Sequence, residues 1–212
     1  MDLKDDWVFT CADTGSDAGS DDGRDARASQ EIELSLPFDS VSTLARVGLC
    51  PEPYEGRNAE DLRWIAERDW LLRRTVDLSQ TDVELVAEGL DGVVEIAVNG
   101  QIILTADNAF RTWRADLSEV AHVGRNEIEL RFRSVIRAAQ VRQDAQPFYV
   151  PYHRDNCPIP NINMLRKPQC DFGWDWNPAL APFGVTGRVS ICDTKKPRIA
   201  RVEVAQEHHD IE

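Results

Sequence analysis

The chain has 212 residues, of which 37 are Asp or Glu and 24 are Lys or Arg, so that its formal net charge is -13. This length is enough for one all-β domain with a sizeable core and leaves little over. Nucleic acid and anionic membranes are poor partners for such an acidic surface, because phosphate binding normally needs a basic patch. A neutral sugar ligand is compatible with it.

The ends of the chain and its cysteines bear on where the protein resides. Residues 1–7 lack the basic and apolar regions of a secretory signal, and no apolar run elsewhere approaches membrane-spanning length. The cysteines are scattered, odd in number and without a C-x-x-C pair, which fits free thiols in a reducing compartment. They are Cys11, Cys50, Cys157, Cys170 and Cys192. We therefore expect a cytoplasmic protein with no cofactor and no metal site.

The first third of the chain contains a loop, a strand and two short helices. Residues 13–29 are rich in Asp, Gly and Ser and predict a flexible acidic loop. Ile32, Leu34 and Leu36 then alternate with polar residues, which predicts a strand with one buried face. Residues 40–47, closed by Gly48, predict a short helix, and a turn or two of helix is expected from Asn58.

Two further segments predict antiparallel strands. The apolar run 93–98 continues into Asn99-Gly100 and then 101–104, and Asn-Gly supplies the positive φ angles of a type I′ hairpin turn. Residues 127–132 alternate between charged and apolar side chains. A mostly antiparallel sandwich follows from this pattern. Its expected core positions are Ile32, Leu34, Leu36, Val94, Ile96, Val98, Ile128, Leu130 and Phe132.

The regular alternation ends before Pro147, and the segment 147–182 is rich in prolines and aromatic residues. Long irregular segments in compact domains are usually functional or disordered, and the aromatic content argues against disorder. We interpret 147–182 as a ligand-facing loop. After Cys192 the chain reads as a linker, and Ile199–Ala205 resembles the first strand of a further domain.

Within this loop, Trp174, Asp175 and Trp176 suit sugar recognition. An indole face can cover the C–H face of a pyranose, a carboxylate accepts hydrogen bonds from hydroxyl groups, and Gly173 allows close approach of the backbone. Residue types alone favour the alternative of a core aromatic pair in which Asp175 caps a turn, and only the wider pattern of the sequence favours sugar recognition.

Several blocks of sequence resemble, in order, the N-terminal sugar-binding domain of the glycoside hydrolase family 2 β-mannosidases. The most specific is the run RKPQC-FGWDW-P between Arg166 and Pro178. The others are Trp7–Phe9, Pro37–Leu49, Pro53–Asn58 with Leu62–Trp70, Glu88–Asp91, Val98–Gly100, Ala106–Arg111 and Arg131–Ser134. The chain departs from the family pattern at Phe38 and Asn177, where Gly is usual, and Phe183–Gly187 lacks a tryptophan often found there.

The resemblance implies an all-β fold, an antiparallel jelly-roll or galactose-binding-like β-sandwich with one or two short helices. Residues 1–194 would form this domain, and 195–212 the linker and the first strand of a truncated immunoglobulin-like domain. The intact parent would be an exo-acting retaining β-mannosidase that removes terminal β-D-mannose from the non-reducing end of manno-oligosaccharides. In the family the chemistry resides on a later (β/α)8 barrel, which alone needs about 250 residues. The chain is therefore expected to be a fragment.

The same resemblance assigns Trp174 and Asp175 to the subsite that holds the terminal sugar. Arg166 and Trp176 are weaker candidates, since Arg166 could instead support the loop through a carboxylate pair and Trp176 through packing. No catalytic residue is expected in the chain, because retaining hydrolysis needs two carboxyl groups that the family supplies from the barrel. Asn126-Glu127 mimics the family's acid/base dipeptide but opens a regular strand, so the chain alone is predicted to be inactive.

Two alternatives remain open. The parent could be a family 2 enzyme of other specificity, such as a β-galactosidase or β-glucuronidase, although these usually lack the RKPQC-FGWDW-P run. The chain could also be a stand-alone carbohydrate-binding module. The apolar segment Ile199–Ala205 argues against the second alternative, because it begins an element that the chain does not complete.

Overall fold

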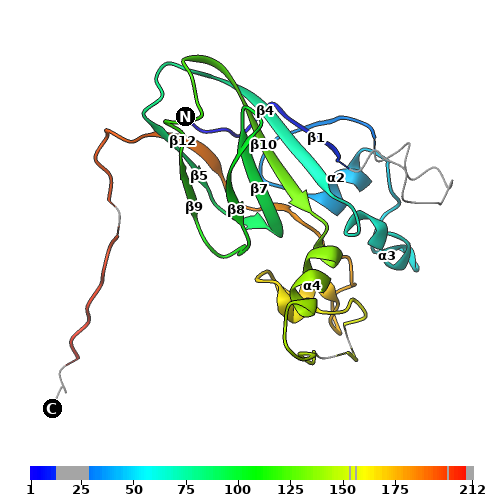
Figure 1. Cartoon of the computed structure of the whole chain (residues 1–212). Coiled ribbons are helices and arrows are strands. Elements are labelled where there is room, and N and C mark those ends of the chain that lie inside the picture. Colours follow the sequence, from blue (N-terminus) through cyan, green and yellow to red (C-terminus); the bar gives the residue numbers. More distant parts are fainter. Residues whose placement is uncertain (13–28, 153, 156, 200, 209–212) are drawn as a thin grey trace.

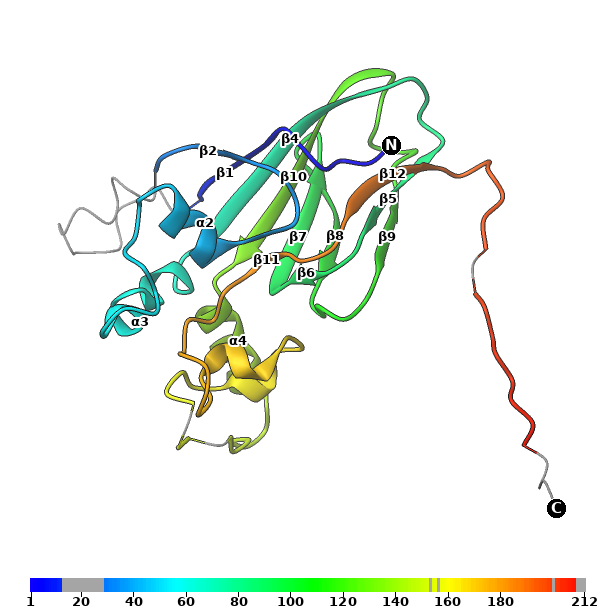
Figure 2. The ribbon, with the colours of Figure 1, turned by 180° about the vertical axis from the view of Figure 1, so that it is seen from behind.

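The computed structural model describes residues 1–12, 29–152, 154–155, 157–199 and 201–208. The predicted acidic loop 13–29 therefore lies, except for Ser29, outside the described residues. The strands form two antiparallel layers, with short helices at one end (Figures 1 and 2).

One layer of the sandwich is a six-stranded sheet in the order β2-β1-β4-β10-β7-β8, and the other contains two three-stranded sheets, β3-β11-β6 and β12-β5-β9. The strands are β1 (Trp7–Cys11), β2 (Ile32–Leu34), β3 (Phe38–Asp39), β4 (Trp70–Leu78), β5 (Val83–Ala87), β6 (Leu90–Asp91), β7 (Val93–Val98), β8 (Gln101–Ala106), β9 (Trp113–Asp116), β10 (Gly124–Arg133), β11 (Gly184–Val185) and β12 (Val189–Asp193). The α-helices are α2 (Ser40–Arg46), α3 (Asn58–Asp61) and α4 (Val135–Asp144), and the 3-10 helices are η1 (Arg63–Ile65), η2 (Ile162–Met164) and η3 (Gln169–Phe172). The predicted all-β sandwich is confirmed.

The predicted core positions face the space between the two layers. Eight of the nine are buried, and the three on β10 are at most 1% exposed. Leu34 is partly buried, because it lies on β2 at the edge of the six-stranded sheet. The two-residue period of the sequence therefore identifies the buried face of the sheet correctly.

The hairpin between β7 and β8 also forms as predicted. Asn99 and Gly100 have φ angles of 51° and 80°, the geometry of a type I′ turn. The Asn99 side chain adds support from the neighbouring strand, because its Oδ1 accepts from the backbone N–H of Glu127 at 2.9 Å and its Nδ2 donates to Asn126 Oδ1 at 2.9 Å.

Aromatic rings fill the end of the core nearest α4. Phe9 stacks on Trp70 with ring centroids 4.9 Å apart, and Phe183 lies 5.4 Å from Phe132. Phe38, which replaces the usual family glycine, is buried and meets Phe9 edge to face at 5.2 Å. The substitution thus adds an aromatic ring to the core rather than disturbing it.

Gly184 lies where β3, β11 and β6 approach one another closely. It pairs with Asp39 on β3 and with Asp91 on β6, and a Cβ at this position would lie 2.2 Å from the carbonyl oxygen of Phe38. Only glycine permits so close an approach between strands. The packing here depends on Gly184 and the buried Phe183, without a tryptophan after them.

The short helices agree with the predictions. Asp39 caps α2 by accepting from Ser42 N at 2.8 Å, and Gly48 follows the helix with a φ of 74°. In α3 the acidic residues Glu60 and Asp61 lie in the first turn, where the helix dipole favours negative charge.

The ten-residue helix α4 is a further helix that was not located from the sequence. Its buried stripe consists of Val135, Ala139 and Gln143, a spacing of four residues that is helical but weakly apolar. The clearest signal is the N-cap, Ser134, whose Oγ accepts from Arg137 N at 3.1 Å. A stripe with only one large apolar side chain does not stand out from the sequence.

Beyond β12 the chain follows the sandwich briefly and then leaves it (Figure 1). Lys195 pairs with Asp82, and Arg198 with Glu84. Residues 201–208 have no regular secondary structure, so the strand expected at Ile199–Ala205 is not formed in this part of the chain. An extended segment without a neighbouring strand has nothing to pair with its backbone. That it begins a further domain remains a prediction.

Across the described residues, no helix has both the length and the apolar character needed to cross a bilayer.

Candidate functional site

The described part of residues 135–182, which we call the appendage, lies beneath one end of the sandwich (Figures 1 and 2). It comprises α4 and the described residues of the predicted ligand-facing loop 147–182. The 3-10 helix η2 contacts both α4 and η3, so that the irregular segment folds back against the helix. All four predicted site residues belong to this appendage.

Trp174, Asp175 and Trp176 form a tight turn. Its ends are joined by two backbone hydrogen bonds, from Trp174 N to Asn177 O at 2.9 Å and from Asn177 N to Trp174 O at 3.4 Å. Asp175 and Trp176 occupy the two central positions. The turn therefore presents three adjacent side chains that suit sugar recognition on one short, hydrogen-bonded piece of backbone.

All three side chains of this turn are exposed. Trp174 is 45% and Trp176 69% accessible to solvent, and Asp175 makes no side-chain hydrogen bond or ion pair with any described residue. The alternative of a core aromatic pair with Asp175 as a turn cap is therefore wrong. Trp176 also does not support the loop by packing, because most of its indole faces solvent.

The base of the turn is buried and well connected. Gly173 has a φ of 109°, a conformation that other residues rarely adopt, so glycine is needed here for the backbone itself. Its carbonyl oxygen accepts a hydrogen bond from Cys157 Sγ at 3.2 Å. Burial raises the pKa of the Cys157 thiol, which keeps the donating proton in place. Asn177 Nδ2 donates to Cys170 O at 2.8 Å, a bond that the usual family glycine could not make.

Arg166 lies beside the loop between β8 and β9. Its backbone carbonyl accepts from Ala109 N at 2.9 Å, whereas its side chain is exposed and forms no ion pair with the described residues. The predicted carboxylate pair is therefore not present. The loop that it contacts carries Phe110, whose ring is exposed and was not predicted as a site residue, although it lies in the family block Ala106–Arg111.

The cation that does form ion pairs with carboxylates is the next residue, Lys167. Its side chain is fully buried and forms ion pairs with Asp171 in η3 and with Asp91 on β6, where the Nζ–Oδ1 distance is 3.3 Å. The ammonium group also lies 5.3 Å from the ring centroid of Phe172. We call Asp91, Lys167 and Asp171 the buried charge cluster. It joins the segment that carries the tryptophan turn to the sandwich.

The two carboxylates of this cluster outnumber its single cation. Burial raises the pKa of Asp91 from 3.8 to about 6; the Lys167 charge acts in the opposite direction, and the nearby Asp171 raises the pKa further. Oδ1 of Asp91 is buried and has no hydrogen-bond partner among the described residues, so the 3.3 Å contact with Lys167 acts as an ion pair without good hydrogen-bond geometry.

A second set of charges fixes the start of the appendage. Asp69, in the block that precedes β4, accepts from Ser134 N at 2.7 Å and from Arg137 Nη2 at 2.9 Å through Oδ1, and from Arg133 Nη1 at 2.6 Å through Oδ2. A carboxylate at the first turn of α4 accepts hydrogen bonds from N–H groups that have no partner within the helix, and its negative charge interacts favourably with the positive end of the helix dipole. The family block Leu62–Trp70 thus positions the appendage.

The dipeptide Asn126-Glu127 is structural, as predicted. Asn126 is buried on β10, and its Nδ2 donates to the carbonyl oxygens of His122 at 2.7 Å and Gly124 at 2.8 Å. Its Oδ1 accepts from His122 N and from Asn99 Nδ2, each at 2.9 Å. With these bonds the side chain holds the turn before β10, while Glu127 faces solvent.

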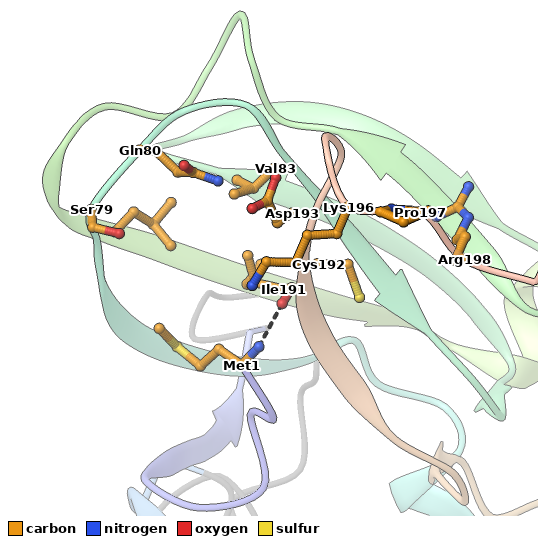
Figure 3. A pocket seen from close by; sticks show the side chains of 11 residues that line it. Met1, Ser79, Gln80, Val83, Ile191, Cys192, Asp193, Lys196, Pro197 and Arg198 are labelled. Carbon is orange, nitrogen blue, oxygen red and sulfur yellow. Dashed lines mark hydrogen bonds between the residues drawn. The ribbon is translucent and has the colours of Figure 1, made fainter.

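A hollow of about 600 Å³ lies at the end of the sandwich remote from α4 (Figures 1 and 3). Ile191 and Lys196 line it, and the amino group of Met1 donates to Ile191 O at 2.6 Å. None of the four predicted site residues lines this hollow. The candidate site is thus the exposed turn of the appendage.

Residues 7–187 match the family model described as the glycosyl hydrolase 2 galactose-binding domain-like domain. The chain belongs to this family. The matched range contains most of the sandwich core, the appendage and all four predicted site residues, so the resemblance seen in the ordered sequence blocks is confirmed.

Several curated relatives of this family member are β-mannosidases. The goat β-mannosidase is 34% identical over 175 residues, which cover 77% of this chain and 20% of the relative. A probable β-mannosidase of Caenorhabditis elegans is 30% identical over 168 residues, covering 74% of this chain and 19% of the relative. The chain thus spans about a fifth of the length of the curated relatives that it matches.

Solved structures confirm the fold. The β-D-mannosidase of Dictyoglomus thermophilum superposes with a TM-score of 0.75 and 25% identity, over 91% of this chain and 22% of that one. An exo-chitosanase from Amycolatopsis orientalis reaches a TM-score of 0.55 at 16% identity, over 91% of this chain and 20% of that one. The second likeness extends to the fold alone.

Proposed function

We propose that the chain is the sugar-binding domain of an exo-acting, retaining β-mannosidase, whose intact form removes terminal β-D-mannose from manno-oligosaccharides. The observation that carries the proposal is the exposed Trp174–Trp176 turn, held rigidly at its base, in a chain whose curated relatives are β-mannosidases. Trp174 offers an indole face for the apolar side of a pyranose. Asp175 offers a carboxylate that has no partner among the described residues and can accept hydrogen bonds from the hydroxyl groups of the sugar.

The domain would complete the subsite for the terminal sugar. An exposed turn cannot enclose a sugar by itself, whereas ligand sites bury most of their ligand and often lie between domains. The remaining walls would come from the rest of the parent polypeptide, which we propose to include an immunoglobulin-like domain and a (β/α)8 barrel. Trp176 and Arg166, both exposed, would lie at the border of the subsite.

The chain alone would be inactive. Retaining hydrolysis needs two carboxyl groups held about 5 to 5.5 Å apart, with one acting as acid/base and the other as nucleophile. Among the acidic groups of the appendage, Asp171 is engaged in the buried charge cluster, Asp144 accepts a hydrogen bond from Gln140, and Asp175 stands on a turn suited to binding. The chemistry would therefore belong to the part of the relatives' length that this chain does not span.

The proposal is tested by the substrate preference of the intact parent. With p-nitrophenyl glycosides of β-D-mannose, β-D-galactose, β-D-glucose and β-D-glucuronic acid, we expect the highest kcat/KM on the mannoside. Preference for the galactoside or the glucuronide would contradict the proposal and favour a family 2 enzyme of other specificity.

Calorimetry on the 212-residue chain separates the proposal from a stand-alone binding module. A site that lacks most of its walls should bind mannose only in the millimolar range or more weakly. Micromolar affinity for mannose would instead indicate that the chain is a complete binding module.

A further inference from the structure

A second hollow, which we call the α4 pocket, lies on the appendage between the end of α4 (Figure 1) and the loop that follows it. Its volume is about 550 Å³, within the range of about 300 to 1,000 Å³ typical of small-molecule sites. None of the four residues of the predicted terminal-sugar subsite lines it. The α4 pocket is therefore a separate feature of the same appendage.

Phe148 forms the apolar part of its lining. The ring is 68% exposed and makes no ring contact with the described residues, whereas the backbone beneath it is fixed. Gln143 Nε2 donates to Phe148 O at 3.2 Å, and Val150 N donates to Gln143 Oε1 at 3.1 Å. Together with the neighbouring Tyr149, which is also exposed, Phe148 forms an aromatic patch on an anchored backbone that is available for contact with a ligand.

Arg154 contacts two tyrosines that line the pocket with Phe148. The guanidinium carbon lies 5.8 Å from the ring centroid of Tyr149 and 5.4 Å from that of Tyr152, and Nη2 donates to Tyr149 Oη at 2.9 Å. Such cation–π contacts restrain the aromatic rings, and each of them contributes a small favourable electrostatic energy at an exposed site. The result is a preorganised aromatic wall, which lowers the entropy lost on binding.

Short polar side chains form the opposite rim. Gln140 Nε2 donates to Asp144 Oδ1 at 2.7 Å, and Asn161 Nδ2 donates to Gln140 Oε1 at 2.8 Å. These bonds leave Asp144 Oδ2 and Gln146 Oε1 without partners among the described residues. The lining thus combines aromatic faces with amide and carboxylate acceptors, and its one carboxylate and one guanidinium give no net charge.

We propose that the α4 pocket is a second carbohydrate subsite, which binds an inner hexose unit of a neutral oligosaccharide. Aromatic faces cover the C–H faces of a pyranose, and the acceptors of the rim receive its hydroxyl protons. The absence of net charge favours a neutral ligand over a phosphate or a uronic acid. The identity of the hexose as mannose rests on the proposed function, whereas the subsite itself rests on the pocket.

The test is an NMR titration of the isotopically labelled 212-residue chain with β-1,4-mannotriose and, separately, with mannose. We expect mannotriose to shift the side-chain amide signals of Gln146 and Asn161, with a smaller response to mannose at equal concentration. Phe148→Ala should weaken mannotriose binding about threefold to tenfold, because an aromatic contact contributes about 0.5 to 1.5 kcal/mol. Val141→Ala, at an exposed position of α4 outside the pocket, is the matched control and should bind as the wild type does.

Gln146→Ala is the second variant and should also weaken binding, since Gln146 is exposed and its loss leaves the fold intact. The inference is overturned if neither mannotriose nor β-1,4-galactotriose shifts any signal of the α4 pocket, or if both variants bind the oligosaccharide as tightly as the wild type. A negative result in this titration would not contradict the proposed activity of the intact parent on mannosides, which is tested separately. Conversely, pocket signals that respond to β-1,4-galactotriose and not to mannotriose would support the subsite and contradict the mannoside as its ligand.

Discussion

In the sandwich, Phe9, Trp70 and Phe183 pack against one another away from solvent, whereas in the appendage Trp174 and Trp176 stand on the surface. The sandwich is stabilised by apolar burial, and the appendage, which also buries apolar side chains such as Leu165 and Phe172, is joined to it by the buried charge cluster and by backbone hydrogen bonds as well. A segment held in this way keeps its aromatic side chains available for a ligand. The difference between the two regions leads to four predictions about stability.

The largest effect is expected at Lys167. Lys167→Met removes the cation of the buried charge cluster and leaves Asp91 and Asp171 unpaired, which should lower the free energy of unfolding at neutral pH by about 3 to 5 kcal/mol. Arg166→Met is the matched control, because the neighbouring cation is exposed, and should change stability by less than about 0.5 kcal/mol. Urea denaturation followed by circular dichroism measures both. Equal effects of the two variants would show that the cluster does not hold the appendage.

Asp91 should make stability depend on pH. Since its pKa is raised from 3.8 to about 6 in the folded protein, its contribution to stability is fully present below about pH 4 and is lost as the pH rises through 6. A difference of about two pKa units corresponds to about 3 kcal/mol. The free energy of unfolding of the wild type should therefore fall by about that amount relative to Asp91→Asn between about pH 4 and about pH 8. A difference that stays constant with pH would contradict the raised pKa.

Asp69→Asn should lower the free energy of unfolding by a somewhat smaller amount. The amide keeps one acceptor oxygen but loses the charge that binds Arg133 and Arg137, which is worth about 1.5 to 3 kcal/mol. Asp39→Asn is the control at the cap of α2, where Asn caps as well as Asp and a change below about 0.5 kcal/mol is expected. Similar losses in the two variants, measured by denaturant unfolding, would mean that Asp69 acts as an ordinary helix cap.

The smallest effect is expected for the exposed turn. Trp176→Ala should leave the free energy of unfolding within about 0.5 kcal/mol of the wild type, because little of the indole is buried. Trp70→Ala, by contrast, should cost about 3 to 5 kcal/mol through the cavity left in the core. Circular dichroism is the suitable probe, since both variants lose a fluorophore. A decrease of more than about 2 kcal/mol in the free energy of unfolding of Trp176→Ala would show that the turn has a structural role.

The sandwich could be predicted from sequence because its signals are local. Alternation on β10 and the Asn99-Gly100 turn depend on neighbouring residues, and both appear in the structure as expected. The missed helix α4 has a stripe of Val135, Ala139 and Gln143 that is too weakly apolar to stand out. Its start is fixed instead by Asp69, which is distant in sequence.

The candidate site was predictable in part for the same reason. The run from Arg166 to Pro178 could be located by resemblance, but residue type does not tell an exposed indole from a buried one. The roles of Arg166 and Lys167 show this most clearly. The two cations are adjacent in sequence, and it is the fold that buries Lys167 between Asp91 on β6 and Asp171 in η3 while Arg166 stays exposed.

The central claim is that the Trp174–Trp176 turn binds sugar and does not hold the fold together. Its most direct test is Asp175→Ala in the intact parent, with kcat/KM on a β-mannoside and the melting temperature measured together. We expect kcat/KM to fall about ten- to 150-fold for each charge-assisted hydrogen bond lost, at about 1.5 to 3 kcal/mol per bond, with an unchanged melting temperature. A lowered melting temperature with kcat/KM near that of the wild type would contradict the claim.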